Sequence, residues 1–334
     1  MNRRLSYTLI IEYLVYVLVR VLERIIVMIP EGPALAVGRF VGRLVFILFA
    51  DRRKAAIENL TIAYGREKSA SWILRTARRN FEHIGTSSVE FFRIRRWSEE
   101  EMARRLVMDG RLTYNLLMSA GNHGICILNS HFGTFEVGAT LAKWLGWDVH
   151  LIVTPLRNPF LSRYLFSRGG EDTGIKTYGH KGVVKDLIQL LRSGEMVAFL
   201  ADQRGDAERG IFVNYFGAMA PANEVFAKIA IEGKARVMPL ATYRGDDGRY
   251  YSRFYEEVLI EPTGDKKADL ITVSQRFHDL FEEWVRSRPE QGFWIHRKWK
   301  RKRSRRRRTK AAPINCREAD VACGRNDVAE GKSQ

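Results

Sequence analysis

A histidine followed five positions later by a glutamate is the strongest chemical signal in this sequence. In "ICILNSHFGTFEVG" an apolar run ends in Asn129 and Ser130, His131 comes next, and Glu136 follows. We expect Glu136 in the first turn of a helix, where its carboxylate can reach back to one imidazole nitrogen. The other nitrogen could then act as a general base on a hydroxyl. The pattern leaves open a structural histidine at a strand end.

Two further segments place polar or flexible residues beside apolar runs. "FLADQRGD" predicts a strand that ends in Asp202 and Gln203, which would face the same site. "VNYFGAMAPA" predicts a turn at Phe216 and Gly217, with Pro221 near the start of a helix, and we expect the two turn residues to bind substrate. The N-terminus of that helix could take an anionic group.

An arginine and a glycine complete the candidate site. In "FLSRYLFSRGGED", Arg168 comes before two glycines at the predicted end of a helix. It could hold a phosphate or stabilise an oxyanion, or it could be a cation that favours a helix C-terminus. Gly133 allows a tight turn directly after His131.

Several other chemistries lack their motifs. The sequence has no G-x-S-x-G elbow, no P-loop and no H-E-x-x-H. Spacing typical of a metal site is missing from the remaining histidines, which are His83, His123, His150, His180, His278 and His296. We therefore expect neither a metal nor another cofactor.

The elements that must position these residues alternate between strand and helix. Apolar or alternating runs predict strands at "ICILNS", "VHLIVTPL", "IKTYG", "MVAFLAD", "RVMPLATY" and "YYSRFYEEVLI". Helices are predicted over residues 69–94, 136–145, 158–168, 180–193, 221–232 and 269–287, and at "WSEEEMARRLVM". This alternation predicts an α/β fold with a mixed central sheet flanked by helices.

The two ends of the chain differ from its middle. Residues 1–50 hold two apolar segments separated by "PEGP", which predict membrane-associated helices or long core helices. Residues 51–300 would form the globular domain. Residues 301–334 are basic and then polar, and predict a disordered tail.

The net charge and the cysteines narrow the setting of the protein. The formal charge is +17, but "RKWKRKRSRRRRTK" carries eleven basic residues, and without them about +6 remains. A basic surface is compatible with an anionic lipid, a nucleic acid or an acidic protein. The three cysteines, Cys126, Cys316 and Cys323, do not form a disulfide framework and weakly indicate a reducing compartment.

The combined motifs resemble the late acyltransferases of bacterial lipid A biosynthesis, the lauroyl and myristoyl transferases. "NSHFGTFE" resembles their H-x-x-x-x-E signature, related to the H-x-x-x-x-D of the wider lysophospholipid and glycerolipid acyltransferase superfamily. "RRKAAIENLTIAYG", "DVHLIVTPLRNPFLSRYLFSRGG", "FLADQ", "FVNYFGAMAPA" and "RPEQGFWIHRKWK" follow in the order of that family. The resemblance covers about residues 8–300, and Phe135 stands where tryptophan is common.

The resemblance implies a glycerolipid-acyltransferase-like fold at the bacterial inner membrane, with its active site facing the cytoplasm. The enzyme would move an acyl chain from acyl carrier protein to a hydroxyl of a lipid A precursor, forming an acyloxyacyl ester. His131 would be the general base and Glu136 would orient it. Arg168 would assist at the oxyanion or a phosphate, and Asp202 and Gln203 would shape the polar end of the site.

The resemblance also leaves details open. Backbone N–H groups near Gly133 are candidate oxyanion donors. Relatives that acylate another glycolipid or an aminolipid share these motifs, so the acceptor is undecided. A membrane-bound nucleic-acid-binding protein that uses the arginine-rich run is an alternative of another class, but it gives the H-x-x-x-x-E segment no role. We therefore expect no nucleic acid partner.

Overall fold

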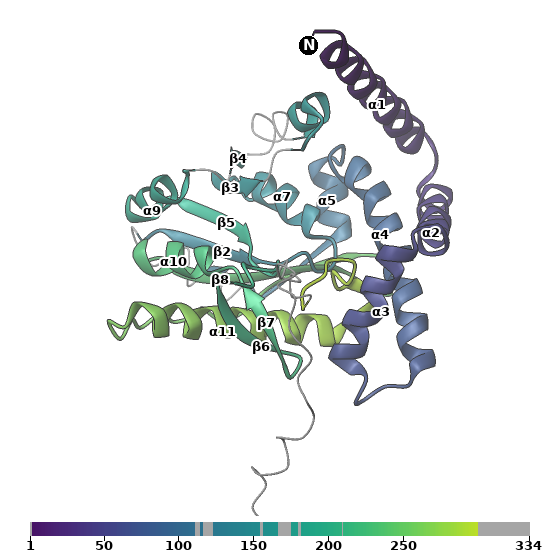
Figure 1. The fold of residues 1–334 in the computed structure, drawn as a ribbon. Helices are drawn as coiled ribbons and strands as arrows, with labels where there is room; N and C mark the ends of the chain where they lie inside the picture. The colour runs from purple at the N-terminus through teal and green to yellow at the C-terminus, as the bar shows by residue number, and fades with distance from the viewer. Residues whose placement is uncertain are drawn as a thin grey trace, which may run out of the picture. The chain divides into compact units, whose positions relative to one another are not determined.

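The chain folds around a seven-stranded sheet that has helices on both faces (Figure 1). The structure is a computed structural model, and it describes residues 2–110, 114–115, 123–153, 156–165, 175–179, 182–208 and 210–299. Residues Met1–Lys300 group into one unit. The predicted tail, residues 301–334, lies outside the described residues, and the predicted division at residue 50 stays a prediction.

The strand order is β1-β9-β8-β2-β5-β3-β4. The strands are β1 (Leu106–Asp109), β2 (Ile125–Asn129), β3 (Val149–Val153), β4 (Ile175–Gly179), β5 (Met196–Leu200), β8 (Arg236–Arg244) and β9 (Tyr250–Phe254). Strands β8, β2, β5, β3 and β4 are mutually parallel, whereas β9 runs antiparallel to β8 and parallel to β1. The prediction of a mixed sheet flanked by helices is confirmed.

The central strand β2 has a core on each side. Cys126 and Leu128 belong to the larger apolar cluster, and Ile127 belongs to a second cluster. Because side chains alternate along a strand, an uninterrupted apolar run of this kind supplies both faces. The larger cluster includes side chains of α3 (Ala50–Tyr64), α4 (Ala70–Ile94), α9 (Val184–Arg192), α10 (Glu224–Glu232) and α11 (Lys266–Ser287). The second includes side chains of α5 (Glu99–Arg105) and α7 (Phe135–Trp144).

Most predicted elements are confirmed with shifted ends, and three differ. The segment "WSEEEMARRLVM" forms α5 only as far as Arg105, because its last apolar residues pair with β9 as strand β1. Helix α10 starts at Glu224 rather than 221, because Pro221 lies in a strand. The hairpin of β6 (Ile211–Tyr215) and β7 (Ala218–Ala222) was not predicted, although its turn at Phe216 and Gly217 was.

The two N-terminal helices are α1 (Asn2–Met28) and α2 (Glu31–Leu48). No helix within the described ranges is by itself both long and apolar enough to cross a membrane. Helices α2 and α3 meet that test only as a pair, bent by 93°. Their predicted membrane association stays a prediction.

Helix α2 packs against α4 through glycines that let the two backbones touch. A Cβ atom on Gly42 would lie 2.2 Å from the carbonyl oxygen of Phe81, and one on Gly85 would lie 2.1 Å from that of Gly38. Both distances are far below a van der Waals contact. The contact therefore excludes every side chain larger than hydrogen at these positions.

We expect Gly85→Ala to lower the free energy of unfolding by about 1–3 kcal/mol, because the added methyl group must force α2 away from α4. Thermal unfolding of the purified protein measures this. Gly32→Ala is the matched control, since a Cβ there meets nothing within 4 Å and should not lower the melting temperature. Equal melting temperatures for the two variants would show that the helices separate freely.

Candidate active site

His131 and Asp202 meet because two neighbouring parallel strands end at the same level. Asn129, the last residue of β2, is the register partner of Leu200, the last residue of β5. His131 and Asp202 each follow two residues later. The imidazole Nδ1 lies 2.8 Å from Asp202 Oδ1, and both side chains are mostly buried. The sheet thus builds an imidazole–carboxylate pair at the carboxyl ends of its central strands.

The second imidazole nitrogen contacts Gln203. Its amide nitrogen lies 3.1 Å from Nε2 of His131. Because an amide nitrogen only donates, Nε2 accepts this hydrogen bond and the ring proton is on Nδ1, facing Asp202. The unprotonated nitrogen therefore faces Gln203, whose side chain is exposed.

The ionised form of Asp202 and the protonated form of His131 are both stabilised although the two side chains are mostly buried. Burial alone would raise the pKa of Asp202, but the neighbouring His131 and Lys298 lower it to about 2. Burial opposes the charged form of His131, yet the charge and hydrogen bond of Asp202, with a smaller contribution from Glu136, raise the imidazole pKa above 6.5. Asp202 is thus ionised at neutral pH and favours a proton on the ring.

Two aromatic rings fix the plane of the imidazole. Phe293 stacks on it with centroids 4.9 Å apart and an interplanar angle of 19°. Phe135 meets it edge-on, with centroids 5.1 Å apart. These contacts, with hydrogen bonds at both nitrogens, leave the ring little rotational freedom.

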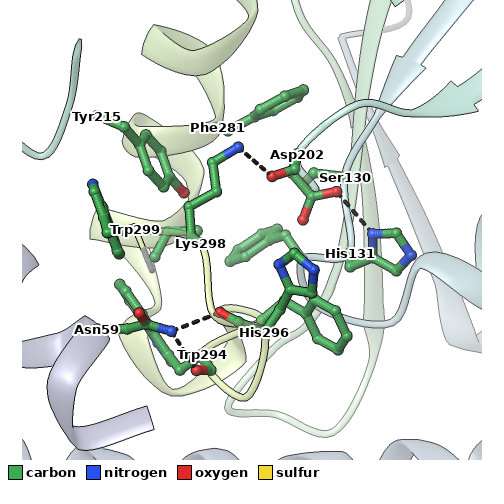
Figure 2. Close-up of a pocket in the computed structure, with 13 residues that line it drawn as sticks. Asn59, Ser130, His131, Asp202, Tyr215, Phe281, Trp294, His296, Lys298 and Trp299 are labelled. Carbon is green, nitrogen blue, oxygen red and sulfur yellow. Dashed lines mark hydrogen bonds and ion pairs between the residues drawn. The ribbon is translucent and has the colours of Figure 1, made fainter. Parts of the chain in front are cut away.

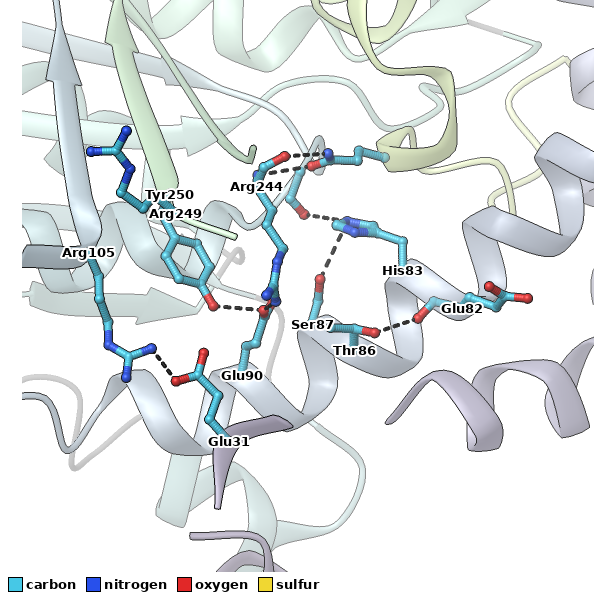
Figure 3. A network of polar contacts seen from close by, with 12 residues as sticks. Glu31, Glu82, His83, Thr86, Ser87, Glu90, Arg105, Arg244, Arg249 and Tyr250 are labelled. Carbon is cyan, nitrogen blue, oxygen red and sulfur yellow. Dashed lines mark hydrogen bonds and ion pairs between the residues drawn. The ribbon is translucent and has the colours of Figure 1, made fainter. Parts of the chain in front are cut away.

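Gly133 forms the turn after His131. Its φ is +65°, and a Cβ atom would lie 2.2 Å from the carbonyl oxygen of Thr242. Its N–H donates to the carbonyl of Gln291 at 2.9 Å, and its carbonyl accepts from Nε2 of His83 at 3.1 Å. Figure 3 shows the His83 ring within this polar network. The His83 ring can be this donor while neutral, since burial lowers its pKa to about 4. The turn is therefore held from both sides.

A small pocket lies beside the pair, with a cavity volume of about 30 Å³. Figure 2 shows His131, Asp202 and Lys298 around it. The other lining residues are Asn59, Ser130, Phe132, Tyr215, Phe281, Val285, Phe293, Trp294, His296 and Trp299. This volume suits a water molecule or two and is too small for an acyl chain.

A family model described as bacterial lipid A biosynthesis acyltransferase matches residues 1–301. The chain belongs to this family. As a member of the lipid A acyltransferase family, it is an acyltransferase.

Three curated relatives are similar over different lengths. The lipid A biosynthesis lauroyltransferase of Escherichia coli is 23% identical over 83% of this chain and 88% of its own length. The myristoyltransferase of the same species is 24% identical over 79% of both chains. A lipid A biosynthesis acyltransferase of Haemophilus influenzae is 25% identical over 53% of this chain, and the match spans 54% of that relative.

The structure corrects one contact predicted for this lipid A acyltransferase family member. Glu136 lies in the first turn of α7 as expected, but Asp202 and Gln203 occupy the imidazole nitrogens. Among the described residues, Glu136 has no hydrogen bond to the ring. Burial raises its pKa to about 7, against the opposing effects of its own backbone N–H and His131. Glu136 therefore acts on His131 through charge at a distance.

Three other site predictions change. Gly133 was a candidate oxyanion donor, but its N–H is already bonded to Gln291. Phe216 was expected to bind substrate, but it is a core residue that packs against Tyr64 and Trp294. Neither Phe216 nor Gly217, its partner in the turn, lines the pocket beside His131.

The anion site predicted at the start of α10 also changes. Helix α10 begins after Asn223, whose side chain accepts from the N–H of Val225. Glu224 already places a carboxylate in the first turn, where an anion would otherwise interact with the helix dipole. Arg168 lies outside the described residues.

Several residues of the site were missed because they come from distant segments. Phe293 and Lys298 belong to "RPEQGFWIHRKWK", and Tyr215 ends β6. The signal that could have found them was the cluster of aromatic residues in an otherwise polar and basic segment. Aromatic side chains beside a basic run indicate burial rather than a solvated tail.

We expect Asp202→Asn to lower the pKa of His131 more than Glu136→Gln does, because Asp202 supplies both a charge and the hydrogen bond. Titration of the His131 ring by NMR measures both changes, and the acid limb of kcat/KM should move to lower pH with the ring pKa. Asp246→Asn, at a fully exposed carboxylate, is the matched control and should change neither. A larger effect of Glu136→Gln would make Glu136 the principal partner.

Proposed function

We propose that this acyltransferase moves a fatty acyl chain from the thioester of acyl carrier protein to a hydroxyl of a lipid A precursor. The product would be an acyloxyacyl ester. The contact between Nδ1 of His131 and the carboxylate of Asp202, which leaves Nε2 facing the Gln203 amide, is the observation that carries the proposal. A hydroxyl lacks a low pKa and needs a base of this kind. Related proteins named lipid A lauroyl- and myristoyltransferases support the choice of acceptor.

The reaction follows from the arrangement at Nε2. The acceptor hydroxyl would replace the Gln203 amide there and give its proton to Nε2 as its oxygen attacks the thioester carbonyl. The tetrahedral intermediate then collapses to an ester and expels the thiolate of the carrier. The imidazolium, stabilised by ionised Asp202, returns the proton to that thiolate. Atoms and charge balance across these steps. The absence of a metal or other cofactor stays a prediction.

The oxyanion of the intermediate needs a donor, and the described residues narrow the choice. The N–H groups of Gly133 and Thr134 donate to the carbonyls of Gln291 and Thr242 and are therefore engaged. The displaced Gln203 amide is a donor already located at the reacting nitrogen. We propose that Gln203 and Arg168 share this role. Removing one oxyanion donor typically costs about 3–4 kcal/mol, so the reaction needs such donors.

The enzyme would work at the inner membrane with its site facing the cytoplasm, and the N-terminal helices support the membrane contact in this proposal. Most of the exposed large apolar side chains in the described ranges lie on α1 and α2, for example Leu14 and Phe40, each 59% exposed. Exposed apolar side chains that gather on one region of a protein mark a surface that contacts a partner or a membrane. A lipid surface also suits a lipid acceptor, which would reach the site from the bilayer.

We expect purified enzyme to acylate a tetra-acylated, sugar-bearing lipid A precursor from acyl carrier proteins loaded with ten- to sixteen-carbon chains. His131→Ala should lower kcat about 10²- to 10⁴-fold, because it removes the base. Asp202→Asn should cause a loss of similar order, because the ring loses its partner. Mass spectrometry of the product measures each rate. His123→Ala, which replaces an exposed histidine, is the matched control.

Each contrary result of this assay has a distinct meaning. Transfer only to another glycolipid or an aminolipid would overturn the acceptor and leave the chemistry intact. Transfer that survives His131→Ala would overturn the site. Transfer from acyl-coenzyme A alone would overturn the carrier protein as donor.

We expect Leu14→Glu with Leu18→Glu to weaken binding to vesicles of anionic phospholipid at least about 100-fold. Burying each of these side chains contributes about 1.5–3 kcal/mol. Sedimentation with vesicles measures the change. Met219→Glu with Leu259→Glu is the matched control, since both side chains are 61% exposed and lie outside α1 and α2. Equal loss in both double variants would contradict a membrane surface on α1.

A further inference from the structure

Lys298 is a buried lysine in a segment of basic residues. Its side chain ends among three acceptors, beside the Asp202 backbone shown in Figure 2. Nζ donates to the carbonyl of Asp202 at 2.6 Å, to that of Gln203 at 3.3 Å and to Nε2 of His278 at 2.9 Å. Only 6% of the residue is exposed. Three acceptors match the three hydrogens of an ammonium group.

The environment of the ammonium group is built to accept its hydrogens. His278, on α11, donates from Nδ1 to the carbonyl of Ser274 at 2.8 Å, so its Nε2 is left as an acceptor. Burial and the charge of Lys298 keep this ring neutral by lowering its pKa to about 3. Burial also lowers the pKa of Lys298 to about 8, although the charge of Asp202 opposes this.

The segment that carries Lys298 is itself fixed to the protein core. Asn59, buried in α3, donates to the carbonyls of Trp294 and His296 at 2.7 Å each. The lysine therefore reaches the site from a segment that is held in place. A lysine on a mobile surface segment could not hold the backbone of another segment in one position.

The two carbonyls that bind Lys298 belong to the two residues that bind the nitrogens of His131. We propose that Lys298 is a positioning residue that holds the backbone of Asp202 and Gln203, so that their side chains keep His131 as the Nδ1–H tautomer. The catalytic meaning rests on the proposed role of His131 as the base. The structural claim about the tautomer does not.

Selective ¹⁵N labelling of histidine gives a direct readout of the tautomer at a pH where the ring is neutral. The His131 signals are assigned by their loss in His131→Gln. In Lys298→Met we expect a mixture of Nδ1–H and Nε2–H forms in place of Nδ1–H alone. The kcat of Lys298→Met should be about 10- to 100-fold below that of the wild type, with KM little changed. A small displacement of the His131–Asp202 pair is enough to slow the reaction by this factor.

Two further variants separate the donor from other effects. Lys298→Gln keeps an uncharged donor, but its two N–H hydrogens cannot serve all three acceptors. It should therefore give a mixture with more of the Nδ1–H form than Lys298→Met and less than the wild type. Lys228→Met, at a half-exposed lysine of α10 that pairs with Glu232, is the matched control and should behave as wild type. A melting curve for each variant shows whether it folds.

An unchanged Nδ1–H tautomer in folded Lys298→Met would overturn the proposal, even if the rate falls. If Lys298→Met does not fold, Lys298→Gln decides, and an unchanged tautomer there overturns the proposal as well. Because the tautomer is observed without substrates, this outcome is distinct from failure of the acyl-transfer assay.

Discussion

The hydrogen bond between Nδ1 of His131 and the carboxylate of Asp202 is the contact on which the rest of the site depends. It assigns the proton to one ring nitrogen and leaves the other as a base. It also explains why a buried carboxylate is ionised beside a buried ring. Gln203, Phe293 and Phe135 can orient the ring usefully only because this bond fixes its chemistry.

Residues far apart in the chain hold that bond in place. The parallel register of β2 and β5 brings His131 and Asp202 to one level. The segment after α11 then closes over them, with Asn80 of α4 donating to the carbonyls of Glu290 and Gly292. The same helix contributes Glu90, which is buried and paired with Arg244 of β8 (Figure 3). The site is therefore assembled from the sheet, α4 and the segment before residue 300.

The sequence predicted the parts of the site that local patterns encode. An apolar run that stops at His131, and another that stops at Asp202, indicated two strand ends, and the α/β architecture followed from the alternation. Their pairing was not predictable, because strand order is a long-range property. Glu136 was therefore chosen as the partner of His131 on sequence proximity, whereas β5 lies beside β2 in the sheet.

Lys298 was missed for a different reason. It lies in a run of basic residues that resembles a solvated segment, and only the fold shows that its Nζ is enclosed by carbonyl oxygens. Composition describes a run as a whole and says nothing of the one member that points inward. A buried charge of this kind becomes visible only when its acceptors are located.

The glycine contact between α2 and α4 has a consequence for how the enzyme would work at a membrane. Backbone atoms at Gly42 and Gly85 leave no side chain between the helices to absorb a displacement. Helix α4 in turn holds the His131 loop through His83. On a bilayer, this rigid path would fix the height of the imidazole above the lipid plane. The enzyme would then select an acceptor by the depth in the bilayer at which its hydroxyl lies.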